Sequence, residues 1–154
     1  QGVGTFVAQD LHAGLTQSLL WALRYAQVTD REIIDLAQLV ETQCALLAAH
    51  RRTDEDLVDL QDVLQPATTR DDLAAPQTAS DAARFHAALV ACAHNRALTA
   101  VYGPLLALIG GTAESEPIGP GSSVAEQHRR IAECIRQGDV EATRVAMRQH
   151  SHAS

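Results

Sequence analysis

Helix start and stop signals divide this sequence into consecutive segments with apolar residues at helical spacing. Thr29-Asp30-Arg31-Glu32 is a capping box, in which the threonine and the glutamate satisfy free amides at a helix start. Residues 53–56 begin a helix in the same way, and their carboxylates complement the positive end of its dipole. Gly138 is suited to a left-handed C-cap, and Asp139 then begins a last helix. These helix start and stop signals predict an all-α chain.

The apolar periodicity predicts six to seven helices in one antiparallel bundle. They are expected over residues 9–25, 29–50, 53–65, 79–94, 96–109, 123–137 and 139–150. Two prolines indicate a connection or a distorted helix start at 66–78, and glycines and prolines indicate a loop at 110–122. A length of 154 residues fits a single domain, and an aromatic content of 3% favours helices over sheets.

Charge and cysteine content exclude several classes of protein. A net charge of −7 argues against binding of this stretch to a phosphate backbone, which needs clustered basic residues. Without a signal peptide or an apolar run of about 20 residues, the chain is not expected to span or cross a membrane. Cys44, Cys92 and Cys134 are expected to be reduced core thiols of a cytoplasmic protein. Because the chain begins at Gln1, it is expected to be a fragment or a processed product.

Three histidines lie on the apolar faces of three different predicted helices. These are His86, His128 and His150. Burying an imidazole without a partner costs about 1–3 kcal/mol, so each ring needs one. A single histidine of this kind is more often a satisfied core residue, but three that converge would suit a metal ion, which binds neutral imidazole.

The turn at Gly138 gives two of these histidines a common height. His128 lies ten residues before Gly138, and His150 lies twelve after it. At a rise of about 1.5 Å per residue these positions are about 15 and 18 Å from the turn. Antiparallel neighbours would therefore bring both rings to nearly the same level. This spacing permits a shared site.

Several motifs together resemble a known family. The segments are Asp81-Ala-Ala-Arg-Phe-His86-Ala-Ala-Leu89 with His94-Asn95, Glu126-Gln-His128-Arg-Arg-Ile131 with Gly138-Asp139 and His150, and Val40-Glu41 with Leu46-Leu-Ala-Ala49. In this order they resemble the FCD domain, the effector-binding C-terminal domain of the FadR subfamily of GntR transcription regulators. The resemblance covers nearly all of residues 12–152.

The resemblance implies an antiparallel bundle with a central ligand cavity that forms a homodimer and senses a small molecule, often an organic acid. In many members a divalent metal helps to hold the effector carboxylate. The implied metal, Zn²⁺ or Ni²⁺, would be bound by His86, His128 and His150. The implied effector-binding residues are these three histidines with Glu41 and Asn95.

The first residues of the chain resemble the end of a DNA-binding domain. Gly2-Val-Gly4-Thr5-Phe6-Val7 is similar to the last wing strand of the winged helix-turn-helix that precedes such domains. Residues 1–8 would then be a remnant of the wing and linker, and residues 9–154 the helical domain. Operator DNA would be bound by the winged helix upstream, with no DNA-binding residues in this chain beyond the remnant.

Two positions depart from the family pattern. Ala82 stands where the family has an aspartate ligand, four residues before His86, and Ala37 stands where an arginine commonly precedes Glu41 by four. Asp81 is five residues before His86, about 140° away around a helix, and Thr78-Ala-Ser-Asp81 matches a capping box. Both losses suggest a more apolar or differently liganded pocket and weaken the assignment of an organic acid. Three imidazoles can still bind Zn²⁺ or Ni²⁺ with water in the open positions.

The remaining polar and aromatic candidates are expected to serve structural roles. Glu41 is either a buried acceptor that lines the pocket or a surface or interhelical residue. His94 is expected to be exposed or to cap a helix. Trp21 and Tyr25, four residues apart, are expected to pack in the core, with a subunit or domain interface as the alternative. Three further histidines near helix ends are expected at the surface, namely His12, His50 and His152.

The function expected from these observations is that of a sensor. The chain would be the ligand-sensing and dimerisation domain of a DNA-binding transcription regulator, whose effector controls operator binding allosterically. One alternative is a three-histidine metalloenzyme, although the sequence has neither a nucleophilic triad nor a phosphate-binding glycine loop. The other alternative is a dimerisation module that has lost its ligand.

Overall fold

A computed structural model describes residues 14, 16–19, 21–23, 25–65, 79–110 and 124–151. The wing remnant expected at residues 1–8 lies outside the described residues, as do His12, His152 and the capping threonine expected at position 78. The backbone of Asp81 is described but its side chain is not.

Helices account for the regular structure of the described residues, and the prediction of an all-α fold is confirmed. They are α2 (Asp30–Arg51), α3 (Asp54–Leu64), α4 (Ala79–Ala91), α5 (Arg96–Gly110), α6 (Val124–Gln137) and α7 (Val140–Ser151). The described residues between 14 and 25 are also helical or in turns. None of the helices described is long and apolar enough to pass through a lipid bilayer.

The predicted helix boundaries are set by local capping. Thr29 caps α2, and its hydroxyl accepts the amide hydrogen of Glu32 while the Glu32 carboxylate binds back to the cap. Thr53 and Asp56 form the same box at the start of α3. Gly138, with φ +72°, makes the left-handed turn between α6 and α7. Each signal acts within a few residues of the chain, which is why the sequence predicts it.

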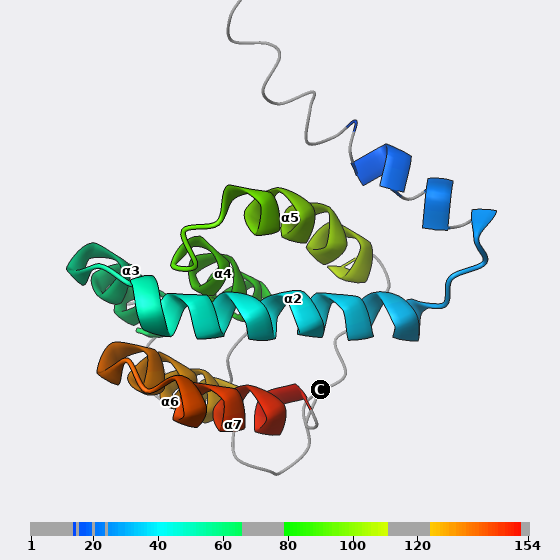
Figure 1. Ribbon diagram of the computed structural model, residues 1–154. Helices are drawn as coiled ribbons and strands as arrows, with labels where there is room; N and C mark the ends of the chain where they lie inside the picture. Colours follow the sequence, from blue (N-terminus) through cyan, green and yellow to red (C-terminus); the bar gives the residue numbers. More distant parts are fainter. Residues whose placement is uncertain are drawn as a thin grey trace, which may run out of the picture.

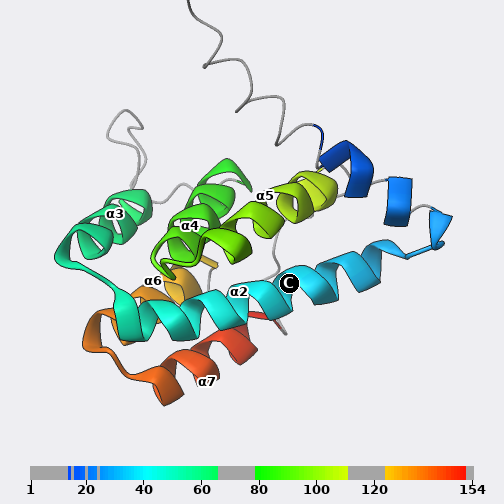
Figure 2. The same cartoon turned by 45° about the horizontal axis from the view of Figure 1, so that its top comes forward.

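Helix α2 is the centre of the bundle. It runs through the molecule with α4 and α5 on one side and the α6–α7 hairpin on the other (Figure 1). Turned by 45°, the bundle shows α5 lying along α4 and α7 running beside α2 (Figure 2). The buried positions in the second half of α2 are mostly small, namely Cys44, Ala45, Ala48 and Ala49. These side chains let the neighbouring helices α4, α5, α6 and α7 approach closely.

Two apolar clusters occupy the two sides of α2. One lies among α2, α3, α4, α6 and α7, and its largest members are Phe85, Leu89, Ile131 and Met147. The other lies among α2, α4 and α5 and includes Val40, Val90, Tyr102 and Leu105. Helix α4 contributes to both clusters. The residues that follow Phe85 on α4 are therefore held on two sides.

Two arginines at the end of α2 join it to the other helices. The Arg51 guanidinium donates to the carbonyl of Ala93, in the turn after α4. The Arg52 guanidinium donates to the carbonyl of Arg136, near the end of α6. Carbonyls at helix C-termini have no partner within their own helix, so these donors satisfy them. Both the α4–α5 unit and the α6–α7 hairpin are thereby attached to one end of α2.

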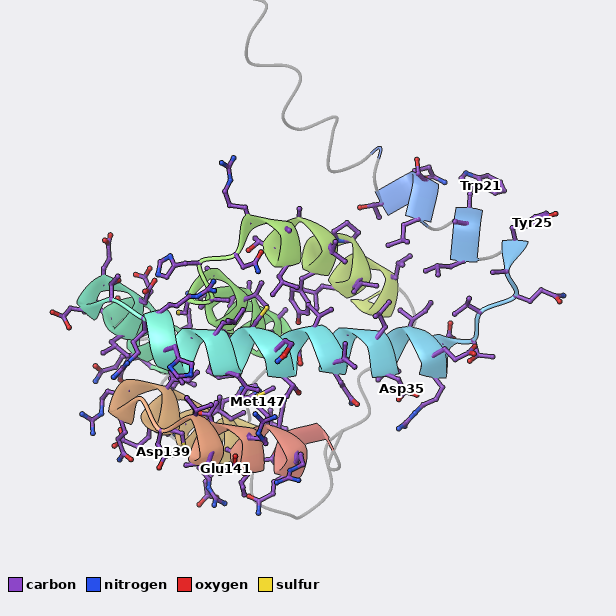
Figure 3. All side chains as sticks on the ribbon, viewed as in Figure 1. Trp21, Tyr25, Asp35, Asp139, Glu141 and Met147 are labelled. Carbon is purple, nitrogen blue, oxygen red and sulfur yellow. The ribbon has the colours of Figure 1, made fainter. Side chains whose placement is uncertain are left out.

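The prediction that Trp21 and Tyr25 pack in the core is wrong for the single chain. Trp21 is 65% exposed and Tyr25 is 93% exposed. Both side chains lie away from helices α2 to α7 (Figure 3). Their helical spacing was correctly recognised, but spacing within one helix does not determine whether its apolar face meets the rest of the same chain. The alternative of an interface with another subunit or domain is left for these two residues.

Candidate metal centre

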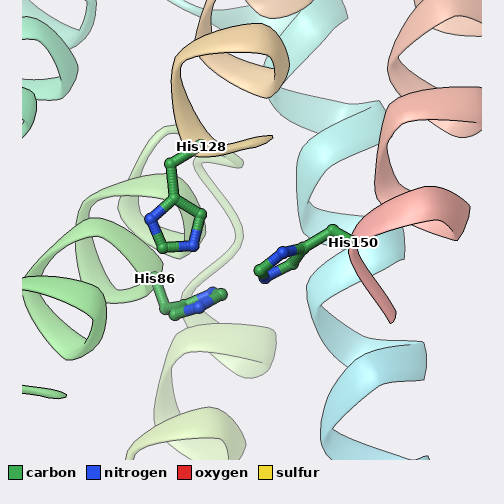
Figure 4. A group of neighbouring side chains, drawn as sticks. All are labelled: His86, His128 and His150. Atoms are coloured by element: carbon green, nitrogen blue, oxygen red, sulfur yellow. The ribbon is translucent and has the colours of Figure 1, made fainter. Parts of the chain in front are cut away.

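The three histidines predicted to converge do so. His86 on α4, His128 on α6 and His150 on α7 point toward one another (Figure 4). One ligand nitrogen from each lies within 4.8 Å of the others. Ring centroids are separated by 4.9 Å between His86 and His128, 5.3 Å between His86 and His150, and 4.8 Å between His128 and His150. Within the described residues this is the one cluster of potential metal ligands.

The α6–α7 hairpin brings two of the rings to one level, as the spacing around Gly138 predicts. His128 stacks on the ring of Phe85, with centroids 4.1 Å apart and an interplanar angle of 18°. Because Phe85 is the residue before His86, this stacking also fixes the height of α6 relative to α4. The position of the site therefore follows from core packing of its immediate neighbours.

His128 is the most deeply buried member of the cluster. Its exposed fraction is 0%, and neither ring nitrogen has a hydrogen-bond partner among the described residues. Burial, followed by the charges of His86 and His150, lowers the pKa of His128 to about 2. The ring is therefore neutral at physiological pH and has a lone pair available for a ligand. An orphaned, fully buried imidazole is costly unless something binds it.

His150 is oriented by a neighbour. Its exposed fraction is 6%, and its Nδ1 lies 2.8 Å from Oε1 of Gln127 on α6. Since a carbonyl oxygen accepts, Nδ1 carries the proton and Nε2 has the lone pair. Burial and His86 lower the pKa of His150 to about 4, against a smaller opposing effect of Glu41. Such an outer partner is what a metal-binding histidine needs to keep its tautomer.

His86 contacts a buried carboxylate. Its Nδ1 lies 3.0 Å from Oε1 of Glu41 on α2, at an angle that does not make a ring N–H hydrogen bond. Glu41 also accepts a hydrogen bond from the hydroxyl of Tyr102 on α5. Burial works to raise the pKa of Glu41, but His86 and the Tyr102 hydroxyl outweigh it and lower this pKa below its ordinary value. Glu41 is therefore an ionised buried acceptor, the first of its two predicted roles.

Other residues named from the sequence have structural contacts. Asn95 caps α5, and its Oδ1 accepts the amide hydrogens of Ala97 and Leu98. An effector-binding role for Asn95 stays a prediction. His94 is exposed as expected, and its Nε2 lies 2.7 Å from Asp56 Oδ2. His50 is also exposed, in agreement with its predicted surface position.

Two residues of the site were missed by sequence reasoning. Tyr102 is buried in the apolar cluster between α2 and α5, where its hydroxyl needs a partner. A tyrosine at helical spacing from Leu98 and Leu105 was the available signal. Gln127 gives no such signal, because a glutamine beside a histidine is common on helix surfaces.

The donor set fits a divalent cation of intermediate softness. Neutral imidazoles suit Zn²⁺ and Ni²⁺, and His128, whose two nitrogens are unpartnered, has one lone pair available for such an ion. The residues that would hold the ion are His86, His128 and His150, with Glu41 beside them.

A protein-family model described as the FCD domain matches residues 32–153, which is well over half of the sequence. No curated protein is similar enough to count as a match.

Proposed function

This chain belongs to the FCD domain family, and from that premise we propose that it is the ligand-sensing and dimerisation domain of a GntR-type transcription regulator acting in the cytoplasm. FCD domains are effector-binding regulatory domains of such regulators. The finer parts of the proposal are the metal-assisted site, the homodimer and the allosteric control of operator binding.

The observation that carries the proposal is the state of His128. The ring is fully buried, both of its nitrogens are unpartnered, and its centroid lies 4.9 Å from that of His86 and 4.8 Å from that of His150. This arrangement is costly in the protein alone and favourable around a cation. A divalent ion bound there would supply a positive charge to which an anionic group of the effector binds. His86, His128 and His150 would orient that group, and the apolar side chains around them would exclude water.

Control of DNA binding would follow from where the histidines originate. His86 is on α4, and the other two are on the α6–α7 hairpin. Both units are attached to α2, through Arg51 and Arg52. An effector that binds one arrangement of these units more tightly shifts the population toward it. The winged helices proposed upstream of residue 9 would then change in spacing or mobility on a two-fold operator.

The proposed dimer requires an apolar surface. Four large exposed residues near the beginning of the described chain are suited to it, namely Trp21, Tyr25, Leu36 and Leu39. Aromatic residues are enriched in the buried parts of interfaces. A second copy of this chain would cover this surface, which sedimentation of the purified protein would detect as a dimer.

The three imidazoles also suit the alternative of a metalloenzyme, but the residues around them support sensing better. A general base must be able to accept a proton from water. The nearest carboxylate, Glu41, already accepts from Tyr102 and contacts His86. A hydrolase screen with added metal would test this alternative.

The test of the metal site is thermal unfolding with Zn²⁺ or Ni²⁺ added to chelator-stripped protein. A ligand at a hundred times its Kd stabilises the folded state by about 2.7 kcal/mol. For a domain of this size that raises Tm by about 5–11 °C. His128→Ala should abolish the rise, and His50→Ala, at an exposed position, should retain it. No rise at saturating metal would contradict the metal site and leave a dimerisation module without a ligand.

A further inference from the structure

We propose that Glu41, held in place by Tyr102, is the carboxylate of this metal centre and determines how tightly the three histidines bind a cation. The inference rests on the proposed metal site and goes beyond it, because the site so far consists of neutral donors. Glu41 reaches the site from α2, whereas the three histidines belong to α4, α6 and α7.

Contacts on two sides fix the Glu41 carboxylate. Its Oε1 lies 3.0 Å from His86 Nδ1 and accepts the hydroxyl hydrogen of Tyr102. Only 9% of Glu41 is exposed, and Tyr102 is buried as well. The His86 contact is short enough for an ion pair, although its angle lies outside that of a good ring N–H hydrogen bond. The Glu41 carboxylate is therefore close enough to His86 to share a cation with the three imidazoles.

The charge around Glu41 supports the same role. A buried carboxylate is stable only when it is paired or binds a metal. In the described part of the chain no arginine pairs with Glu41, and the sequence contains no lysine. The neighbours of the carboxylate are the Tyr102 hydroxyl and the imidazoles of His86 and His150. A divalent cation would add positive charge beside this buried carboxylate.

Helix α4 offers no carboxylate one turn before His86, because position 82 is alanine. Ala82 lies one turn before His86 on α4, and residues four apart differ by about 40° around a helix. An aspartate at 82 would therefore share the face of His86. The chain has alanine there, so Glu41 supplies the negative charge from the opposite helix.

The experiment compares the metal affinity of variants of the whole chain. Zn²⁺ and Co²⁺ are the probes, their Kd values are measured by competition with a chromophoric chelator, and the Co²⁺ absorption spectrum reports the ligand environment. Glu41→Gln keeps the size and removes the charge, and we expect it to weaken binding about 10- to 100-fold and to change the spectrum. Tyr102→Phe should weaken binding by a smaller factor. Glu133→Gln, at an exposed glutamate of α6, is the control and should bind as the parent does.

A compensating variant separates charge from general destabilisation. Ala82→Asp introduced with Glu41→Gln should recover most of the lost affinity, because it returns a carboxylate to the same face of α4. If Glu41→Gln does not fold, Tyr102→Phe and Ala82→Asp in the parent carry the test, with weaker and tighter binding expected.

Parent protein that binds metal with the same Kd and spectrum as Glu41→Gln would overturn this inference alone. Parent protein that binds no metal at all would overturn both the inference and the proposed metal site. The two failures are thus distinguished by the parent protein. Loss of affinity in Glu41→Gln without recovery by Ala82→Asp would show a structural role and would also refute the proposal.

Discussion

Replacing His128 with leucine removes two unpartnered nitrogens from the most buried position of the proposed site. Histidine is retained there at a cost to the metal-free protein, so we expect His128→Leu to be more stable than the parent without metal and unable to bind it. The exposed fraction of His128 is 0%, and no described residue bonds either nitrogen.

The magnitude follows from three contributions. Each buried group without a partner costs about 1–3 kcal/mol, so removing the donor and the acceptor should raise the free energy of unfolding by about 2–6 kcal/mol. Loss of stacking on Phe85, at a centroid distance of 4.1 Å, should lower the free energy of unfolding by about 0.5–1.5 kcal/mol. Imperfect packing of leucine should lower it by up to about 1.5 kcal/mol more. At the middle of each range these contributions leave a net gain of about 2 kcal/mol, or about 4–8 °C in Tm.

The assay is urea unfolding and thermal melting at pH 8 in excess chelator, where the His128 imidazole is neutral in both the folded and unfolded states. His50→Leu serves as the control, because His50 is exposed and its replacement should leave stability nearly unchanged. Adding Zn²⁺ should stabilise the parent and leave His128→Leu unaffected. A metal-free His128→Leu protein that is less stable than the parent would refute the reasoning, since it would mean that the nitrogens are satisfied.

Three further predictions concern pH, the α6–α7 turn and helix capping. Burial, followed by neighbouring imidazoles, lowers the folded-state pKa of His128 to about 2 and that of His150 to about 4, from 6.5. The unfolded chain therefore binds more protons than the folded chain below pH 6.5. The free energy of unfolding of the metal-free domain should fall by up to about 4 kcal/mol between pH 8 and pH 5. Urea midpoints that do not change over this pH range would contradict the prediction. Gly138→Ala should cost at least about 1–2 kcal/mol in denaturant unfolding, because φ is +72° and a Cβ would lie 2.7 Å from Arg52 Nη2. Its control is Gly103→Ala in open helical surroundings, which should stabilise by about 0.5–1 kcal/mol, and equal effects at both glycines would disprove the turn argument. Thr53→Ala should lower the unfolding free energy by about 0.5–2 kcal/mol, and an unchanged urea midpoint would show that the α3 capping box is unimportant.

The features that sequence predicted well depend on short-range physics. Thr29 and Thr53 accept backbone amide hydrogens at helix starts, and Gly138 turns the chain at the end of a helix. Each of these effects acts within a few residues, so the patterns predict the boundaries of α2, α3 and α6 closely. The level of His128 and His150 also follows from counting residues on either side of one tight turn. The FCD resemblance added the order of the motifs along the chain.

The features that sequence did not predict depend on packing between distant helices. Glu41 and Tyr102 are 61 residues apart, and their contact exists because α2 packs on α5. Periodicity places each of them on a face but does not say which faces meet. The same lack of information made the burial of Trp21 and Tyr25 impossible to deduce from their four-residue spacing.

The small side chains on α2 make the candidate centre sensitive to changes far from it. Ala45, Ala48 and Cys44 are fully buried, so neighbouring helices already rest against the α2 backbone with no room to accommodate added carbon atoms. A valine in place of Ala48 would drive the α4 side and the α6–α7 side apart. Two nitrogens bound to one ion at about 2.1 Å lie no more than about 4.2 Å apart, so imidazole nitrogens separated by up to 4.8 Å must approach to hold an ion, and further separation would oppose this. Natural variation on this face of α2 would therefore switch cation binding off while the bundle itself persisted.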